Sequence, residues 1–338
     1  MTSINEADKH IVAELDHMSG KLAKVREAIG KVIFGQTAVV ELALTAILAG
    51  GHALLVGAPG LAKTKLATSL GRVLGLEEKR VQFTPDLMPA DILGSEVLDE
   101  TEQGHRQFRF VPGPVFCQLL MADEINRASP RTQSALLQAM QEYHVTVAGV
   151  RHDVPRPFHV LATQNPIEQE GTYPLPEAQL DRFMLELRVG YPSREEEEQV
   201  VERTTGSAAV SIQPVLDASA ILGIQQLVRR IPVSKGLVRA AVALARMTRP
   251  GDGQAPDFIR EFVEWGAGPR ASQYLVLGAK ARAAMEGRPM ADLDDVRAVA
   301  PAVLRHRLVT NFNAEAAERT SESLVSELVA SPGWGATR

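Results

Sequence analysis

The sequence contains Gly57-Ala58-Pro59-Gly60-Leu61-Ala62-Lys63-Thr64 directly after the apolar run Ala53-Leu54-Leu55-Val56, and a helical pattern begins at Lys65. This order of a buried strand, a glycine-rich turn and a helix that starts with Lys-Thr predicts a binding site for the phosphates of a nucleotide. The backbone N–H groups of the turn and the positive end of the helix dipole both favour an anion there.

Each residue of this turn has an expected role. Lys63 is expected to contact the β- and γ-phosphates of ATP, and the Thr64 hydroxyl to bind Mg²⁺. Ala62 departs from the standard pattern, which has Gly before the Lys, and its methyl group is tolerated only if the residue takes helical φ and ψ values. The plainer interpretation is a Gly-Pro turn with an exposed lysine. Further nucleotide contacts are expected from Gly57, Pro59, Gly60, Leu61 and Ala62.

Two further apolar runs end in polar residues that suit this chemistry. Residues 119–122 are followed by Asp123 and Glu124, and residues 159–163 by a Gln and then Asn165. Because ligands bind at the carboxyl ends of strands in an α/β sheet, Asp123 is expected to complete the Mg²⁺ shell and Glu124 to polarise the attacking water. Asn165 can hydrogen-bond both the water and the γ-phosphate. Each residue alone could instead cap a helix or a turn, but three strand ends in this order point to one site.

The composition limits the class of protein. The chain has 338 residues, 45% of them hydrophobic, enough for one large or two medium cores. The net charge of −5 does not suggest a nucleic-acid partner, and the single cysteine, Cys117, fits a reducing compartment. The apolar stretch 42–56 is interrupted by polar residues and glycines, and no signal peptide opens the chain. We therefore expect a cytoplasmic protein without a membrane span.

Periodicity divides the chain into two parts. Short apolar runs alternate with helical segments, which predicts a parallel α/β sheet with helices on both faces. The strands are expected at residues 53–56, 80–83, 119–123, 160–163 and 183–187. The second part is expected to be an all-helical domain, with helices at residues 218–230, 234–247, 271–285, 293–304 and 315–329.

The expected boundaries follow from these patterns. Residues 1–20 are assigned to an N-terminal extension, 21–192 to the α/β nucleotide-binding domain, 193–216 to a linker and 217–338 to the helical domain. Ser193 is the expected N-cap of a helix that begins with an acidic run.

Two insertions, residues 84–114 and 144–158, interrupt the α/β pattern. Each holds a pair of alternating runs that predicts a hairpin, with turns at Gln103-Gly104 and Ala148-Gly149. Both could be ordinary surface hairpins, but we favour a functional use because ordered hairpins of this size usually have one.

These motifs resemble those of the AAA+ ATPases and, within that class, of the MoxR family. The resemblance covers residues 32–312 and includes the Ala62 departure, which the family shares. It rests on five segments in the family's order: 57–64 (Walker A), 119–128 (Walker B), 162–166 (sensor 1), 176–183 (arginine finger) and 268–272 (sensor 2).

The resemblance implies further site residues. Residues 32–36, including Gly35 and Gln36, correspond to the segment that wraps the adenine. Arg182 corresponds to a finger that enters the neighbouring subunit's site, worth about 10³–10⁵ in rate; a salt bridge to a neighbouring acid is the alternative. Arg270 begins a lid helix and can swing with the lid onto the nucleotide, and its alternative is a surface charge at a helix end. The two insertions correspond to the helix-2 insert and the hairpin before sensor 1, which face the pore or a partner.

The resemblance also implies a function. It indicates a homo-oligomeric ring, expected to be a hexamer, in which ATP hydrolysis with Mg²⁺ drives chaperone-like maturation of a protein client. A partner with a von Willebrand factor A domain is implied as well. A magnesium-chelatase-like subunit is one alternative. A nucleic-acid motor is another, but no nucleic-acid partner is expected because neither hairpin contains lysine, and their only arginines are Arg106, Arg109, Arg151 and Arg156.

Overall fold

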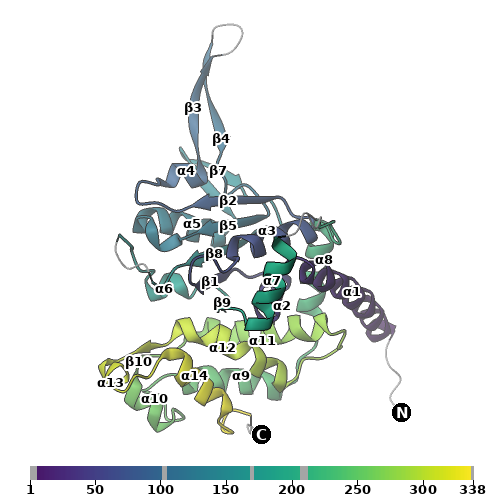
Figure 1. Ribbon diagram of the computed structural model, residues 1–338, viewed down its shortest axis with the longest axis vertical. Helices are drawn as coiled ribbons and strands as arrows, with labels where there is room; N and C mark the ends of the chain where they lie inside the picture. The colour runs from purple at the N-terminus through teal and green to yellow at the C-terminus, as the bar shows by residue number, and fades with distance from the viewer. Residues whose placement is uncertain (1–5, 101–104, 168–170, 206–211, 336–338) are drawn as a thin grey trace.

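The structure is a computed structural model that describes residues 6–100, 105–167, 171–205 and 212–335. Figure 1 shows a long hairpin at the top, a sheet with its helices in the middle and a helical part at the bottom. The expected turn at Gln103-Gly104 lies outside the described residues. No helix among the residues described is long and apolar enough to cross a membrane.

The central sheet confirms the predicted α/β class. Its order is β2-β5-β8-β1-β9, and every neighbouring pair is parallel. The carboxyl ends of all strands therefore lie along one edge of the sheet, and the amino ends along the other. The strands are β1 (Ala53–Gly57), β2 (Glu78–Gln82), β5 (Leu119–Asp123), β8 (His159–Gln164) and β9 (Leu185–Val189).

The two faces of the sheet bury alternate residues of each strand. Leu55 and Leu161 face α2 (Thr37–Ala49) and α3 (Lys63–Val73), whose apolar residues belong to the same core. The adjacent strand residues pack in a second core with α4 (Pro89–Leu93) and α5 (Pro130–Glu142). This alternation is what a strand covered on both sides requires. Cys117 is buried in the second core, and burial raises the pKa of its thiol to about 12.

The C-terminal part is mainly helical, as predicted, but not wholly so. Short strands β10 (Val263–Trp265) and β11 (Val309–Thr310) pair antiparallel. The helix expected over 315–329 is interrupted, because Glu318 has φ 53°, which ends the preceding helical turn. The helices are α8 (Ala218–Arg230), α9 (Lys235–Met247), α10 (Asp257–Phe262), α11 (Pro269–Met285), α12 (Leu293–Leu304), α13 (Phe312–Ala316) and α14 (Ser321–Ala330).

The helical part and the sheet share one continuous core. Helix α11 packs on α2, α8, α9 and α12. Leu44 of α2 and Leu275 of α11 are completely buried in the same cluster. The helical part is therefore fixed to one face of the sheet through α2.

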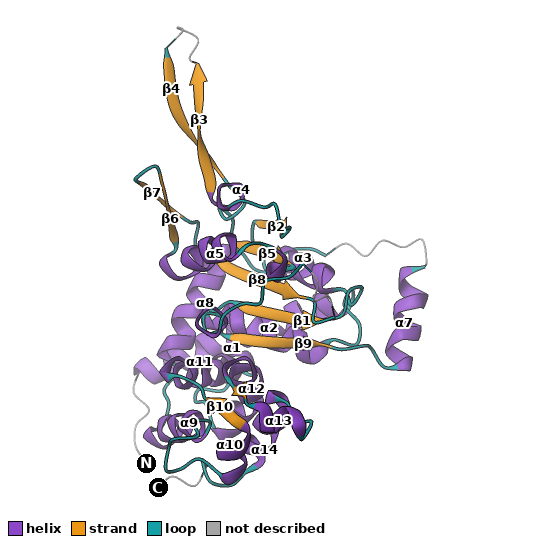
Figure 2. Cartoon of the chain, turned by 90° about the vertical axis from the view of Figure 1, so that its left-hand side faces the viewer, coloured by secondary structure: helices purple, strands orange, loops and turns teal. Residues whose placement is uncertain are grey.

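Two segments differ from the expected boundaries. Helix α1 (Glu6–Gly30) runs through residue 20 without a break, because Leu15, Met18 and Leu22 are buried at helical spacing. Helix α7 (Arg194–Thr204) lies inside the expected linker and stands away from the sheet (Figure 2). Its predicted cap is confirmed, since Ser193 Oγ accepts a hydrogen bond from the Glu196 N–H at 3.3 Å.

Both predicted hairpins are present and project from the same end of the molecule (Figure 2). The longer one pairs β3 (Gly94–Glu100) with β4 (Arg106–Pro112), and the shorter pairs β6 (His144–Val147) with β7 (Val150–Asp153). The rings of Phe110 and His152 stack with centroids 3.8 Å apart, which joins the two hairpins at their bases.

Candidate nucleotide-binding site

The turn between β1 and α3 forms one wall of a cavity of about 360 Å³. Gly60 has φ 83°, a conformation that a side chain disfavours, and this turns the chain back toward the helix. The strand ends predicted from sequence converge on the same cavity, because they share one edge of the sheet. The lining residues are Pro59, Gly60, Leu61, Ala62, Lys63, Thr64, Lys65, Asp123, Glu124, Thr163 and Asn165.

The expectation for the backbone of Ala62 needs correction. Ala62 has φ 57° and ψ 20°, which is the left-handed region and not the right-handed helical one. For a residue with a Cβ this conformation costs about 1–2 kcal/mol. A glycine, which the standard pattern has here, adopts this conformation without that cost. In this chain the turn has the same left-handed residue, so the alanine bears some backbone strain.

Lys63 is folded back over the turn. Its Nζ donates hydrogen bonds to the carbonyl oxygens of Gly57 and Ala58 at 2.5 and 2.9 Å. Burial lowers the pKa of Lys63, while the negative charges of Asp123 and Glu124 act in the opposite direction. To contact a phosphate in the cavity, the ammonium group would have to exchange one of these carbonyl contacts for a phosphate oxygen.

Asp123 ends β5 beside the start of α3. Its Oδ2 lies 3.4 Å from Thr64 Oγ1 and accepts a hydrogen bond from Arg80 Nη2 at 2.7 Å. Its Oδ1 accepts one from Thr163 Oγ1 at 2.5 Å. A hydroxyl and a carboxylate oxygen thus meet at the cavity, a donor set that fits Mg²⁺. Within the described residues no group of three or more His, Cys, Asp or Glu side chains could hold a metal ion.

Glu124 is held by groups that sequence reasoning did not identify. Its backbone has φ 55° and begins the short helix η1 (Ile125–Arg127), and its N–H donates to Thr163 Oγ1 at 2.8 Å. One carboxylate oxygen, Oε2, accepts hydrogen bonds from Gln82 Nε2 at 2.7 Å and Arg127 Nη1 at 3.1 Å. Gln82 lay in a predicted strand, but the order of the strands is needed to place it beside Glu124.

Asn165 is buried at the cavity wall. Its Oδ1 accepts a hydrogen bond from the Ile167 N–H at 3.1 Å. Because the oxygen is engaged in this turn, the amide nitrogen is the donor that remains for a ligand in the cavity.

A smaller, apolar cavity of about 120 Å³ adjoins the turn. Gln36 lines it, and Gln36 Nε2 donates a hydrogen bond to the Gly190 carbonyl at 3.1 Å. Gly35, next to Gln36, has φ 69°, and a Cβ at this position would meet the side chain of Glu196. The chemistry of the lining suits an adenine ring. The other lining residues are Val32, Ile33, Phe34, Gly60, Leu61, Ala62, Lys65, Pro192 and Val200.

Arg182 and Arg270 lie together at the opposite edge of the sheet. Arg182 follows α6 (Glu177–Leu180) and precedes the amino end of β9, whereas the phosphate turn follows the carboxyl end of β1. The five residues of β1 separate the two edges by about 16 Å. Neither arginine lines the phosphate cavity of its own chain.

The contacts of the two arginines differ. Arg270 Nη1 pairs with Asp181 Oδ2 at 2.8 Å, and a third arginine, Arg307, pairs with Asp181 Oδ1 at 2.8 Å. The Asp181 carboxylate is therefore engaged on both oxygens. Within the described parts of the chain the Arg182 guanidinium makes no hydrogen bond or ion pair. Burial, together with the positive charge of Arg270, lowers the pKa of Arg182, while the negative charge of Glu142 acts in the opposite direction.

Comparisons with known proteins agree with this geometry. Residues 52–185 match the model of the ATPase family associated with various cellular activities (AAA), and residues 258–328 match an AAA lid domain. A putative ATPase from Cytophaga hutchinsonii has a similar structure, with a TM-score of 0.87 and 34% identity over 96% of this chain and 97% of the other.

Relatives narrow the family further. The chain is 41% identical to the chaperone MoxR1 of Mycobacterium tuberculosis, over 89% of this chain and 79% of the relative. It is 32% identical to the protein MoxR of Methylorubrum extorquens, over 85% of this chain and 87% of the relative. The chain belongs to the MoxR family of AAA+ ATPases. This MoxR-family chain is also 39% identical to the uncharacterized protein YeaC of Bacillus subtilis, over 91% of this chain and 93% of that protein.

Membership of the MoxR family implies nucleotide binding, usually with Mg²⁺. AAA+ proteins assemble into rings, which suggests an oligomer for this chain as well.

Proposed function

We propose that this chain hydrolyses ATP at sites shared by neighbouring subunits of a hexameric ring and uses the energy to remodel protein clients. The observation that carries the proposal is the separation of charges within one chain. Lys63, Asp123 and Glu124 meet at one edge of the sheet, and the two arginines lie at the other. A heterologous, head-to-tail ring brings opposite edges of adjacent subunits together.

The residues at the carboxyl edge act on the nucleotide of their own subunit. Lys63 neutralises the β- and γ-phosphates, and Thr64 and Asp123 hold Mg²⁺, which supplies positive charge to the phosphates when bound. Glu124 polarises the attacking water. The Asn165 amide nitrogen donates to the γ-phosphate and orients that water.

The residues at the amino edge act on the neighbour's nucleotide. Arg182 makes no ion pair with the described residues of its chain, and the charges that act on it are those of the cation Arg270 and the anion Glu142. A phosphate from the neighbouring subunit would give its guanidinium a direct anionic partner in the transition state. We therefore assign Arg270 to the neighbour's side of the site as well. The sequence had instead led us to expect that a lid motion brings Arg270 onto the nucleotide.

The hairpins support a protein client. Leu98 and Phe108 are directly opposed on β3 and β4, and their side chains are 52% and 70% exposed. Val97 and Val111 of the same hairpin are exposed as well, and we infer that this apolar surface binds other protein.

The same hairpins give little support for binding nucleic acid. Arg109 pairs with Asp99 at 2.9 Å and Arg151 with Asp153 at 2.8 Å. The Arg156 guanidinium lies 3.6 Å from the centroid of the Tyr143 ring. Arginines that are already neutralised or stacked within the chain contribute weakly to phosphate binding.

The partner and the location are further parts of the proposal. The similarity to MoxR proteins supports a partner with a von Willebrand factor A domain and a cytoplasmic location. Affinity capture with the Glu124→Gln variant and ATP tests the partner, because a ring that binds but does not hydrolyse ATP holds its complexes longest. Recovery of no protein with such a domain would contradict this part.

The nucleotide chemistry has its own experiment. Glu124→Gln should bind ATP like the unmodified chain and lose turnover, because an amide cannot polarise water as a carboxylate does. Lys63→Ala should lose binding itself. Size-exclusion chromatography in the presence of ATP should reveal a ring-sized species for both the unmodified chain and Glu124→Gln. Equal hydrolysis by these two proteins would contradict the site assignment.

A further inference from the structure

A buried arginine of the helical part holds the loop that carries Arg182. Arg307 ends the short helix η2 (Arg305–Arg307), and its side chain lies beneath that loop. Its Nε donates to Asp181 Oδ1 at 2.8 Å, and its Nη2 donates to the carbonyl oxygens of Asp181 and Phe183 at 3.0 and 2.7 Å. Arg182 therefore stands between two residues whose carbonyl groups are fixed by one guanidinium.

The setting of Arg307 explains why only an arginine fits. Its Nη1 donates to the Val303 carbonyl of α12 and, at 3.4 Å, to the Met184 carbonyl. Burial lowers the pKa of Arg307, and the charge of Asp181 opposes that effect. A guanidinium offers five donors in a planar fork, whereas a lysine has one nitrogen and cannot reach all of these acceptors together.

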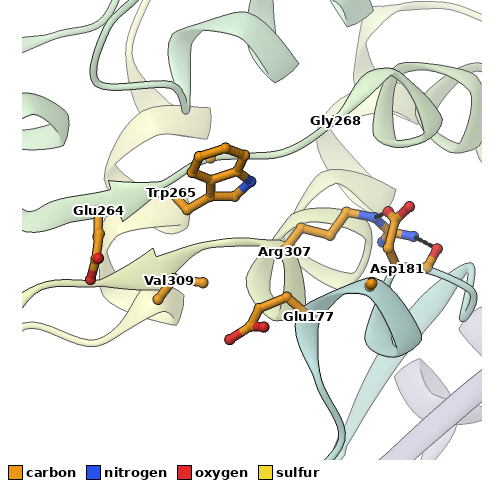
Figure 3. A pocket seen from close by; sticks show the side chains of 9 residues that line it. Glu177, Asp181, Glu264, Trp265, Gly268, Arg307 and Val309 are labelled. Atoms are coloured by element: carbon orange, nitrogen blue, oxygen red, sulfur yellow. Dashed lines mark hydrogen bonds and ion pairs between the residues drawn. The ribbon is translucent and has the colours of Figure 1, made fainter.

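The loop is tied to the helical part at a second point. Arg270, in the first turn of α11, donates to Asp181 Oδ2, so one carboxylate joins two arginines that come from different lid helices. Figure 3 shows Asp181 and Arg307 in contact at one end of a cavity of about 630 Å³, with Trp265 of β10 on its other side. The loop and the helical part are thus connected by charge-assisted hydrogen bonds at two places.

We propose that Arg307 is a positioning residue that fixes Arg182 for the neighbouring subunit's site, so that the orientation of the helical part in one subunit sets turnover in the next. This inference rests on the role of Arg182 in trans proposed above. Arg307 itself does not reach the nucleotide, because it is buried in its own chain; it acts through the backbone of residues 181–183.

The variant Arg307→Lys tests the inference, with Arg305→Lys as a matched control. Arg305 lies on the same short helix, is also partly buried, and bonds to the Pro301 carbonyl and Glu322 instead of the loop. In the full-length ring, Arg307→Lys should lower kcat about 10- to 100-fold, as a displacement of a catalytic group by about 1 Å does. ATP affinity measured with a fluorescent analogue should stay within twofold, and Arg305→Lys should change neither quantity.

A double variant separates positioning from a general structural role. In the Arg182→Ala background, Arg307→Lys should cause no further loss of kcat, because its effect passes through Arg182. A further loss there, or full activity of Arg307→Lys alone, would overturn the inference. If Arg182→Ala is itself fully active, the proposed trans role fails first, and the two failures are distinguishable.

A second variant, Asp181→Asn, keeps the inference testable if Arg307→Lys folds poorly. Asp181→Asn removes the charge from the same connection and leaves the three loop carbonyls in place. It should show the same pattern: lower kcat, unchanged ATP affinity and no added effect on Arg182→Ala. Wild-type kcat in a well-folded Asp181→Asn ring would contradict the inference.

Discussion

Gln82 Nε2 donates a hydrogen bond to Glu124 Oε2 at 2.7 Å, across the edge where β2 and β5 lie side by side. Arg127 Nη1, on the short helix η1, donates to the same oxygen at 3.1 Å. The carboxylate that we assign to water polarisation is therefore held by two donors, one from β2 and one from η1. An oxygen so engaged is less available to an attacking water.

Removal of one donor should release this carboxylate. A hydrogen bond to a charged group is worth about 1.5–3 kcal/mol, but this one is exposed and the Arg127 contact to the same oxygen remains. Gln82→Ala should therefore raise basal ATP turnover by only about two- to tenfold, with little change in KM. Gln118→Ala is the control, because Gln118 bonds to the Glu77 N–H and the Arg156 carbonyl and does not line the phosphate cavity. Steady-state phosphate release checks the prediction, and an unchanged or lower rate in Gln82→Ala would contradict it.

Much of the nucleotide edge could be predicted from the sequence because it is encoded locally. Each strand is a short apolar run, and the residue that acts follows its end, as Asp123, Glu124 and Asn165 do. The conformation of Ala62 was predicted wrongly, since the turn imposes a left-handed backbone that the residue type disfavours.

The contacts across the chain could not be predicted in this way. Gln82 meets Glu124 only because β2 neighbours β5, and strand order has no local signature. Asp181 and Arg307 are 126 positions apart and meet through tertiary packing. The interruption at Glu318 was missed for another reason, because a glutamate at positive φ carries no sequence signal.

Buried histidines should make the fold sensitive to acid. Burial lowers the pKa of His52 to about 3 and that of His159 to about 4. The unfolded chain takes up these protons near pH 6.5, but the folded chain does not, so the free energy of unfolding should fall as pH drops from 6.5 toward 4. The slope should approach about 1.4 kcal/mol per pH unit for each histidine.

Urea unfolding at pH 7.5, 6 and 5 measures this slope. Burial also lowers the pKa of His306, so His159→Gln removes one of several such histidines. A glutamine can still donate to the Gly51 carbonyl that His159 Nδ1 contacts at 2.9 Å. In the variant, the free energy of unfolding should change less steeply with pH, by up to about 1.4 kcal/mol per pH unit. An identical slope in both proteins would mean that His159 is not kept neutral by the fold.

The exposed pair on the long hairpin should serve the client and not the chemistry. Phe108→Ser should leave ATP affinity and basal turnover within about twofold, because an exposed substitution far from the cavity changes stability by only about 0.5 kcal/mol. It should abolish binding of the client captured with Glu124→Gln. Phe312→Ser is the control, since Phe312 is 78% exposed but lies on the helical part.

A point substitution is preferable to removing the shorter hairpin. Val145 and Val154 at its base are buried in the second core, so replacing residues 145–156 by a flexible loop would disturb the sheet as well. Client binding by Phe108→Ser that equals that of the unmodified chain would contradict the role of the long hairpin.

Each site uses a carboxylate from one subunit and an arginine from the next, and mixing two impaired variants tests this most directly. Arg182→Ala and Glu124→Gln subunits, each reduced to a low residual rate alone, should form fully active interfaces when co-assembled, at about a quarter of all interfaces for random mixing. As a control, Arg182→Ala mixed with the Arg182→Ala/Glu124→Gln double variant should stay inactive. ATP hydrolysis should recover in the first mixture only. Mixed rings that demonstrably contain both variants and hydrolyse no more ATP than either parent would contradict it.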